Sequence, residues 1–410
     1  MAGKLFLYAT FGILGGAVLL GFFIFPAKEE LLWTKKQENP FAAQGVPPAL
    51  KEPIEKISPF FLPSEIRGVY LTRWSAGSAA QLNQLLFIAK EKSINAVVID
   101  IKDFSGFLAY DTGVALAKEI GAEQENIKNI TEYLELLHNA GLYTIARITV
   151  FQDPVLAASR PDLAIKRLSS DKREVWTDHK GLAWMDPASL EVWEYNTSIA
   201  KDALQKGFDE VNFDYIRFPS DGDIFDTKYP FWDEKTPLED IIRSFFAYLK
   251  EELQGQTISV DLFGLTAANT WDDMGIGQIL EDAFLYFDFV SPMVYPSHFA
   301  EGFLGLEHPD EHPYEIVNFS MAKAKKRLME SGLAAKLRPW LQYFDLAGSN
   351  TSYTPAVVRE QILATQEALG EDYTGYLLWN SSNIYPNQEI REIVMGPIEE
   401  NSAKEQLLIQ

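Results

Sequence analysis

Short apolar runs alternate with longer polar and apolar segments from residue 65 onward. Eight runs are rich in Val, Ile and aromatic residues: 66–72, 94–101, 143–150, 210–218, 257–264, 288–295, 338–345 and 375–380. Runs of this length and composition predict β-strands. The segments between them have the periodicity of helices, and we expect helices at 78–92, 128–140, 188–206, 237–253, 276–285, 314–331 and 355–369.

Glycine follows several of the predicted helices, as at Gly141, Gly207 and Gly332, and a glycine at this position commonly ends a helix. Eight strands that alternate with helices predict a (β/α)8 TIM barrel. An open doubly wound sheet is the structural alternative. It is disfavoured because no Gly-rich phosphate loop follows any of the predicted strands.

The chain divides into four parts. Residues 5–25 carry no charge and, as a helix, would span roughly 30 Å, the thickness of a hydrocarbon core. We therefore expect a transmembrane signal anchor at 1–25 with its amino end inside, although a cleaved signal peptide is the alternative. A Pro-rich linker at 26–64, the barrel at 65–396 and a polar tail at 397–410 follow. Either interpretation of the amino end places the barrel outside the cytoplasm.

Composition excludes several functional classes. Lys and Arg number 36 against 58 Asp and Glu, a net charge of −22 that repels nucleic acid phosphates. The absence of Cys excludes disulfides, thiolate zinc sites and a Cys nucleophile. We predict no cofactor and no metal site. The acidic spacing of 220–226 could hold Ca²⁺, but a solvated acidic loop is the preferred interpretation.

Asp214 interrupts the apolar run 210–218, and a buried charge costs several kcal/mol unless it is paired or needed. In a TIM barrel the chemistry lies at the carboxyl ends of the strands. Single polar residues there are commonly caps or ion pairs, but here many converge on one mouth. The candidate site residues are Asp100, Asp103, Trp184, Asp214, Arg217, Asp261, Tyr295, Asp345, Trp379 and Asn380.

Several carboxylates, an Arg and many aromatic residues in one mouth are typical of a sugar-cleaving site. Glycoside hydrolysis needs one protonated carboxyl group and one ionised carboxylate. Asp214, three residues before Arg217, suits the ionised role, because a nearby cation keeps a carboxylate charged. The apolar surroundings of Asp261 are expected to raise its pKa and suit the acid. Asp345 is a candidate for stabilising the developing positive charge.

Several segments resemble the glycoside hydrolase family first catalogued as a domain of unknown function, DUF4015. The most specific are VNFDYIRFP and SPMVYPSH, and GVYLTRWSAG, VVIDIKDFSG, ARITVFQDP, WMDPASLEVWEYN, SVDLFG and GYLLWNSS are softer. The resemblance covers roughly residues 66–395. It implies a TIM-barrel glycosidase, placement outside the cytoplasm and a carbohydrate substrate, without defining which carbohydrate.

A wider similarity is to the alpha-amylase clan, whose strands four, five and seven end in a nucleophile Asp, an acid Glu and a stabilising Asp. Asp214, Asp261 and Asp345 fall at similar places, but Asp261 replaces the Glu. Asn212 also stands where the clan has an Arg. Chitinase-type barrels share the Met293-x-Tyr295 pattern, yet their catalytic Glu has no match near Ile216.

The resulting hypothesis is a membrane-anchored glycoside hydrolase that cleaves a cell-surface or extracellular polysaccharide, attached to the membrane through residues 5–25. The alternative is a non-catalytic carbohydrate-binding barrel of the cell envelope that uses the same mouth for recognition.

Overall fold

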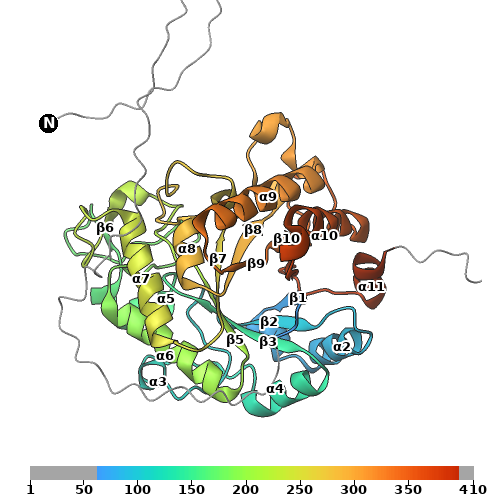
Figure 1. Ribbon diagram of the computed structural model, residues 1–410. Helices are drawn as coiled ribbons and strands as arrows, with labels where there is room; N and C mark the ends of the chain where they lie inside the picture. The colour runs from blue at the N-terminus through green and yellow to red at the C-terminus, as the bar shows by residue number, and fades with distance from the viewer. Residues whose placement is uncertain (1–61, 397–410) are drawn as a thin grey trace, which may run out of the picture. The chain divides into compact units, whose positions relative to one another are not determined.

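The computed structural model describes residues 62–396, which form a closed parallel β-barrel surrounded by helices (Figure 1). Its strands, in the order in which they pair around the barrel, are β1 (Ile66–Leu71), β2 (Ala96–Lys102), β3 (Tyr143–Thr149), β5 (Glu210–Asp214), β7 (Ile258–Phe263), β8 (Phe289–Val294), β9 (Lys336–Leu337) with β10 (Trp340–Gln342), and β11 (Gly375–Trp379).

Segments β9 and β10 are two pieces of the seventh barrel strand. Pro339, which has no N–H to donate, lies in the break between them. Both pieces pair with β8, and β10 also pairs with β11, which in turn pairs with β1. The barrel is therefore closed by eight parallel strands, and the predicted (β/α)8 fold is confirmed.

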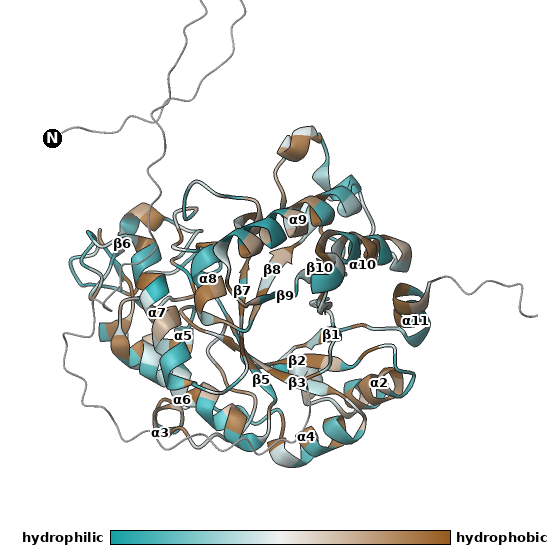
Figure 2. Cartoon of the chain, viewed as in Figure 1, coloured by the Kyte–Doolittle hydropathy of each residue, from teal (hydrophilic) through white to brown (hydrophobic). Residues whose placement is uncertain are grey.

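The helices that cover the barrel are α2 (Ala79–Lys90), α4 (Ile130–Asn139), α6 (Leu190–Lys206), α7 (Leu238–Glu252), α8 (Leu280–Tyr286), α9 (Pro313–Ser331) and α10 (Pro355–Leu369). The predicted helices match these, except that the helix expected at 276–285 begins at Leu280. Figure 2 shows brown and teal residues on the same helices, as expected for helices with one buried side.

Shorter elements complete the loops. The helices α1 (Arg73–Ala76), α3 (Ala115–Glu119) and α5 (Pro154–Ser159) follow β1, β2 and β3, and α11 (Asn387–Met395) ends the described chain. The two-residue strands β4 (Lys166–Arg167) and β6 (Thr227–Lys228) pair antiparallel. This ribbon ties the long loop after β3 to the loop after β5.

The fourth barrel strand is shorter than predicted. It ends at Asp214 rather than near 218, because Tyr215 has a φ of 53° in the left-handed region and turns the chain out of the sheet. A bulky residue rarely adopts this conformation, and such backbone strain concentrates at functional sites. Asp214 is therefore the last residue of its strand.

No helix within residues 62–396 is long and apolar enough to cross a membrane. The predicted membrane segment at 5–25, most of the predicted linker at 26–64 and the tail at 397–410 lie outside the described residues. The anchor and the domain boundaries therefore remain predictions.

Candidate active site

Arg147 is the centre of the polar cluster inside the barrel. It lies on β3 and contacts three carboxylates from three other strands: Asp100 on β2, Asp214 on β5 and Asp261 on β7. The Nη1–Oδ1 distance to Asp100 is 2.5 Å, and the Nε–Oδ2 distance to Asp261 is 3.4 Å. One guanidinium therefore serves three buried acids, and the cluster carries an excess of carboxyl groups.

Asp214 is held at both of its oxygens. Oδ2 accepts a hydrogen bond from Nη2 of Arg147, and Oδ1 accepts one from the backbone N–H of Tyr215 at 2.5 Å. The donor of the second bond lies in the peptide unit that joins Asp214 to Tyr215, where the strand ends and the chain enters the left-handed turn. Both oxygens of the carboxylate are therefore held at the end of its strand.

Asp261 is 1% exposed, and its Oδ1 accepts hydrogen bonds from Asn212 Nδ2 at 2.9 Å and Trp340 Nε1 at 2.8 Å. Burial, followed by repulsion from Asp214, raises its pKa to about 7, although Arg147 and the two donors oppose the rise. A carboxyl group with a raised pKa thus lies beside one that is ion-paired with Arg147, which is an arrangement that acid–base catalysis uses. The expectation that the pKa of Asp261 is raised agrees with this geometry.

Asp100 joins the cluster to an aromatic wall. Its Oδ2 accepts a hydrogen bond from the Tyr70 hydroxyl at 2.5 Å. The Tyr70 ring stacks on Trp379 with ring centroids 3.9 Å apart, and the Arg147 guanidinium lies 5.0 Å from the Trp379 ring. Burial raises the pKa of both Asp100 and Tyr70. Of the predicted site residues, Asp100 and Trp379 are therefore brought together with Asp214 and Asp261.

Tyr295 is a further predicted site residue beside the cluster. Burial, followed by the charges of Asp261 and Asp214, raises the pKa of its hydroxyl. The hydroxyl has no hydrogen-bond partner among the described residues, and its ring meets Phe344 edge to face at 5.5 Å. An unpartnered buried hydroxyl beside two carboxyl groups is a candidate for contacting a bound substrate.

Arg217 does not have the partner that its sequence position predicts. The cation that contacts Asp214 is Arg147 on the neighbouring strand, and the Arg217 guanidinium instead lies over the rings of Trp184 and Phe263, at 4.7 and 4.8 Å. Its Nη1 donates to the backbone oxygen of Phe218. Arg217 therefore makes no direct contact with Asp214, although the charge of Asp214 still acts on it.

The other predicted residues occupy the surrounding loops. Asp103 pairs with Arg73 at 2.6 Å, and Trp184 donates from Nε1 to Asp178 at 3.1 Å.

Asn380 accepts from the backbone N–H of Ser382, and exposed Asp345 accepts from the backbone N–H of Tyr353 at 2.7 Å. The structure does not place Asp103, Asp345 or Asn380 in contact with Arg147.

Arg147 is the central residue that the sequence reasoning missed. The signal was available, because Tyr143, Ile145 and Arg147 alternate along one strand and so share a face. Its charge could have been recognised as the counterpart of the Asp on the next strand. Tyr70 could have been recognised in the same way, because it shares a strand face with Ile66 and Gly68 and lies just before the end of a predicted strand.

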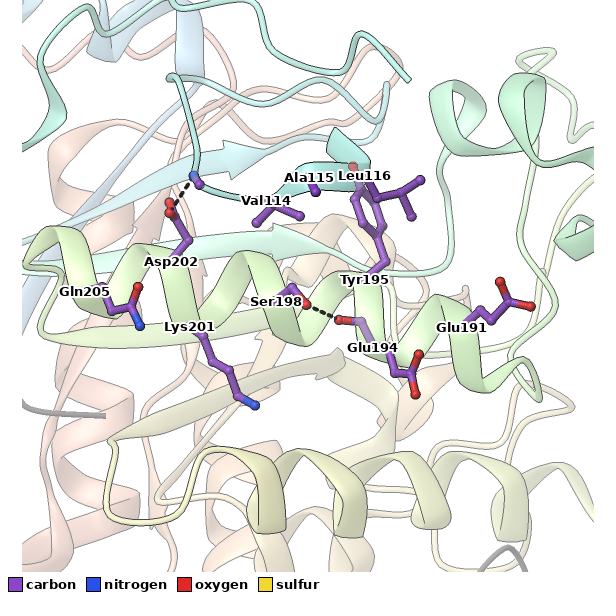
Figure 3. Close-up of a pocket in the computed structure, with 11 residues that line it drawn as sticks. Val114, Ala115, Leu116, Glu191, Glu194, Tyr195, Ser198, Lys201, Asp202 and Gln205 are labelled. Atoms are coloured by element: carbon purple, nitrogen blue, oxygen red, sulfur yellow. Dashed lines mark hydrogen bonds between the residues drawn. The ribbon is translucent and has the colours of Figure 1, made fainter. Parts of the chain in front are cut away.

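A surface pocket of about 470 Å³ lies on the outside of the barrel, between the segment at Gly113–Leu116 and helix α6 (Figure 3). Its lining includes Glu191 and Glu194, which lie on α6, and none of the clustered carboxylates. It is therefore distinct from the polar cluster at the strand ends. Among residues 62–396 no group of acidic or histidine side chains could hold a metal ion.

Comparison with known proteins identifies relatives of the barrel. Residues 68–385 match the DUF4015 family, described as "Putative glycosyl hydrolase domain". No curated protein sequence matches the chain. A hypothetical protein from Ruminiclostridium thermocellum is 36% identical over 47% of this chain and 96% of its own, with a TM-score of 0.43.

Two more distant structures show the same fold. The glycoside hydrolase domain of PgaB (BpsB) from Bordetella bronchiseptica is 14% identical over 80% of this chain and 99% of its own, with a TM-score of 0.56. Alpha-L-fucosidase isoenzyme 2 from Paenibacillus thiaminolyticus is 12% identical over 84% of this chain and 50% of its own, with a TM-score of 0.52.

Proposed function

Because the chain belongs to the DUF4015 family of glycosyl hydrolase domains, we propose that it cleaves a polysaccharide with Asp214 and Asp261. One observation carries the assignment. Both carboxyl groups contact the same guanidinium, that of Arg147, and the pKa of Asp261 is raised to about 7 by burial and by Asp214. One carboxyl group that holds its proton beside one that is ion-paired is the arrangement that glycoside hydrolysis requires.

In this mechanism Asp214 attacks the anomeric carbon while Asp261 donates its proton to the departing glycosidic oxygen. Water then attacks the anomeric carbon while Asp261 takes its proton, and the bond to Asp214 breaks, which releases the sugar and restores both acids. The two acids contact Nη2 and Nε of Arg147, which are neighbouring nitrogens. This closeness favours the retaining outcome, because retaining pairs lie about 5–5.5 Å apart and inverting pairs about 6.5–9.5 Å.

The remaining predicted residues have supporting roles in the proposal. Tyr295 and Trp379 contact the sugar at the cleaved linkage, and Asp100 holds Arg147 in place. Asp345, on the loop after β10, remains a candidate for stabilising positive charge on the sugar. We also propose, from the uncharged segment 5–25, that the protein is anchored in the cell membrane with its barrel outside the cytoplasm.

A second candidate function is carbohydrate binding without cleavage. It is favoured by one observation: Asp261 is almost fully buried, and Oδ1 accepts hydrogen bonds from both Asn212 and Trp340. A carboxyl group held in this way could stabilise the interior of the barrel instead of taking part in a reaction.

Release of reducing ends from a panel of α- and β-linked polysaccharides distinguishes the two functions. We expect the wild-type protein to release reducing ends from at least one polymer, and Asp214→Asn and Asp261→Asn to release none while remaining folded. Asp345→Asn tests the third acid in the same assay. Folded wild-type protein that binds a polymer without cleaving it would replace the hydrolase with the binding function.

A further inference from the structure

Exposed aromatic side chains are concentrated at one end of the barrel. Among residues 62–396 the exposed Phe and Trp residues are Trp74, Phe87, Phe104, Phe225, Phe231 and Trp271. All except Phe87, which lies on α2, are in segments that follow barrel strands β1, β2, β5 and β7. These segments surround the carboxyl ends of the strands, where the clustered carboxylates lie. Exposed apolar groups that gather beside a site commonly bind a ligand or partner.

Trp74 is an exposed ring that packs against a buried, hydrogen-bonded side chain. The Arg73 guanidinium lies 4.0 Å from the Trp74 ring centroid and covers one of its faces. Arg73 itself is buried and fixed by Asp103 at 2.6 Å, and by Gln124 and Asn126, each at 2.7 Å. Trp74 nevertheless remains 60% exposed. The ring is thus held flat on one side and open to solvent on the other.

The position of this ring connects it to the candidate active site. Trp74 lies in α1, directly after strand β1, whose Tyr70 binds Asp100. Asp103, which fixes Arg73, comes three residues after Asp100 in the chain. The support of the ring and the wall of the carboxylate cluster are therefore built from the same two strand ends.

A flat, fixed ring with one open face suits the apolar face of a sugar, because little conformational entropy is lost when the ring is covered. The chain's net charge of −22 disfavours an anionic polymer. We propose that Trp74 is a sugar-stacking platform, and that the substrate is an uncharged polysaccharide that reaches from the carboxylates to this ring. The inference rests on the proposed function and names its substrate class.

Native gels that contain a soluble polysaccharide test the platform. The purified full-length chain, carrying Asp214→Asn to prevent cleavage, is run through glycol chitin, laminarin, mannan, amylose and dextran. We expect at least one polymer to retard it. Adding Trp74→Ala should weaken that binding about tenfold, which corresponds to about 1.4 kcal/mol. Trp74→Phe should restore most of it, and Phe87→Ala, an exposed aromatic on the outer helices, should change nothing.

Equal retardation of the Trp74→Ala and Phe87→Ala proteins would overturn the platform. Retardation by none of the five polymers would overturn it as well, and would point to a protein partner for the exposed rings. The proposed function fails separately. If binding depends on Trp74 but the wild-type protein releases no reducing ends, the platform stands and the hydrolase does not. If cleavage occurs and Trp74→Ala leaves kcat/KM on the polymer unchanged, the hydrolase stands and the platform does not.

Discussion

Replacing Asp261 by Asn should remove a pH-dependent part of the free energy of unfolding. The pKa of Asp261 is raised from 3.8 to about 7 by burial and by Asp214. Between these values the folded protein holds a proton that the unfolded chain has released. The stabilisation is therefore fully present below about pH 4 and is lost as the pH rises through about 7.

The size of this effect follows from the shift. A difference of about three pKa units at about 1.4 kcal/mol each gives an upper limit of about 4 kcal/mol. Asn cannot ionise, so its protein lacks this dependence. The Asn amide would also face Nε of Arg147, which donates toward Asp261 Oδ2, and this adds a cost that does not vary with pH. The measured quantity is therefore how the difference in unfolding free energy between the two proteins changes with pH, rather than the size of that difference at one pH.

Urea unfolding of both proteins at pH 4, 5, 6, 7 and 8, followed by tryptophan fluorescence, measures the difference. We expect the wild-type protein to lose on the order of 2–4 kcal/mol relative to Asp261→Asn between pH 4 and 7. Stability curves that stay parallel within about 0.5 kcal/mol would refute the reasoning. Such a result would mean that Asp261 is ionised at neutral pH and cannot be the acid of the proposed mechanism.

Two further predictions test the surroundings of this acid, and a third tests the pairing of β11 with β1. Arg147→Met leaves three buried carboxyl groups without their cation and should cost about 3–5 kcal/mol in urea unfolding, and a cost below about 1 kcal/mol would contradict the cluster. Trp340→Phe removes a donor to Asp261 and should move the alkaline limb of kcat/KM, expected near pH 7, upward; an unmoved limb would count against Asp261 as the acid. Gly375→Ala should lower the melting temperature sharply, since its φ is 104° and the added Cβ would lie 1.9 Å from a backbone oxygen. Gly121→Ala, also at positive φ but in open space, should cost much less in the same thermal scan, and equal losses would show that the close contact does not matter.

The barrel was predictable because its signal is local and repeated. Each strand is a short apolar run, and all eight were found at or near their observed positions. The candidate site was predictable in part for the same reason: Asp214 and Asp261 stand out as charges in apolar runs. Their partner was not, because Arg147 is 67 residues from Asp214 in the chain and meets it only through the pairing of β3 with β5.

Local spacing was misleading at Arg217. Two residues separate it from Asp214, but one of them is Tyr215, where the chain makes a left-handed turn, and Tyr gives no sequence signal for that conformation. The seventh strand shows a related limit. Asp345 was expected at its end, yet β10 ends at Gln342 and Asp345 is exposed in the following loop. Strand ends depend on where pairing stops, which the composition of a single run does not determine.

A second buried ion pair in the barrel tests how the interior charges contribute to the free energy of unfolding. Arg338, between β9 and β10, contacts Glu210 at the first residue of β5, and both side chains are fully buried. Glu210 Oε1 also accepts from Ser259 Oγ at 2.5 Å. Arg338→Met alone strands a buried carboxylate and should cost about 3–5 kcal/mol.

Adding Glu210→Gln removes that charge and retains an oxygen that can accept from Ser259. The double variant should therefore recover most of the loss in urea unfolding, since pairs of buried charges contribute little net stability. Ser259→Ala serves as the control for the hydrogen bond alone. A double variant as unstable as Arg338→Met would show that the Arg338 side chain stabilises the barrel by packing. Charge compensation would then explain the Arg147 cluster but not the pair of Arg338 and Glu210. The two acids at the ends of β5, Glu210 and Asp214, would then have different roles in the barrel.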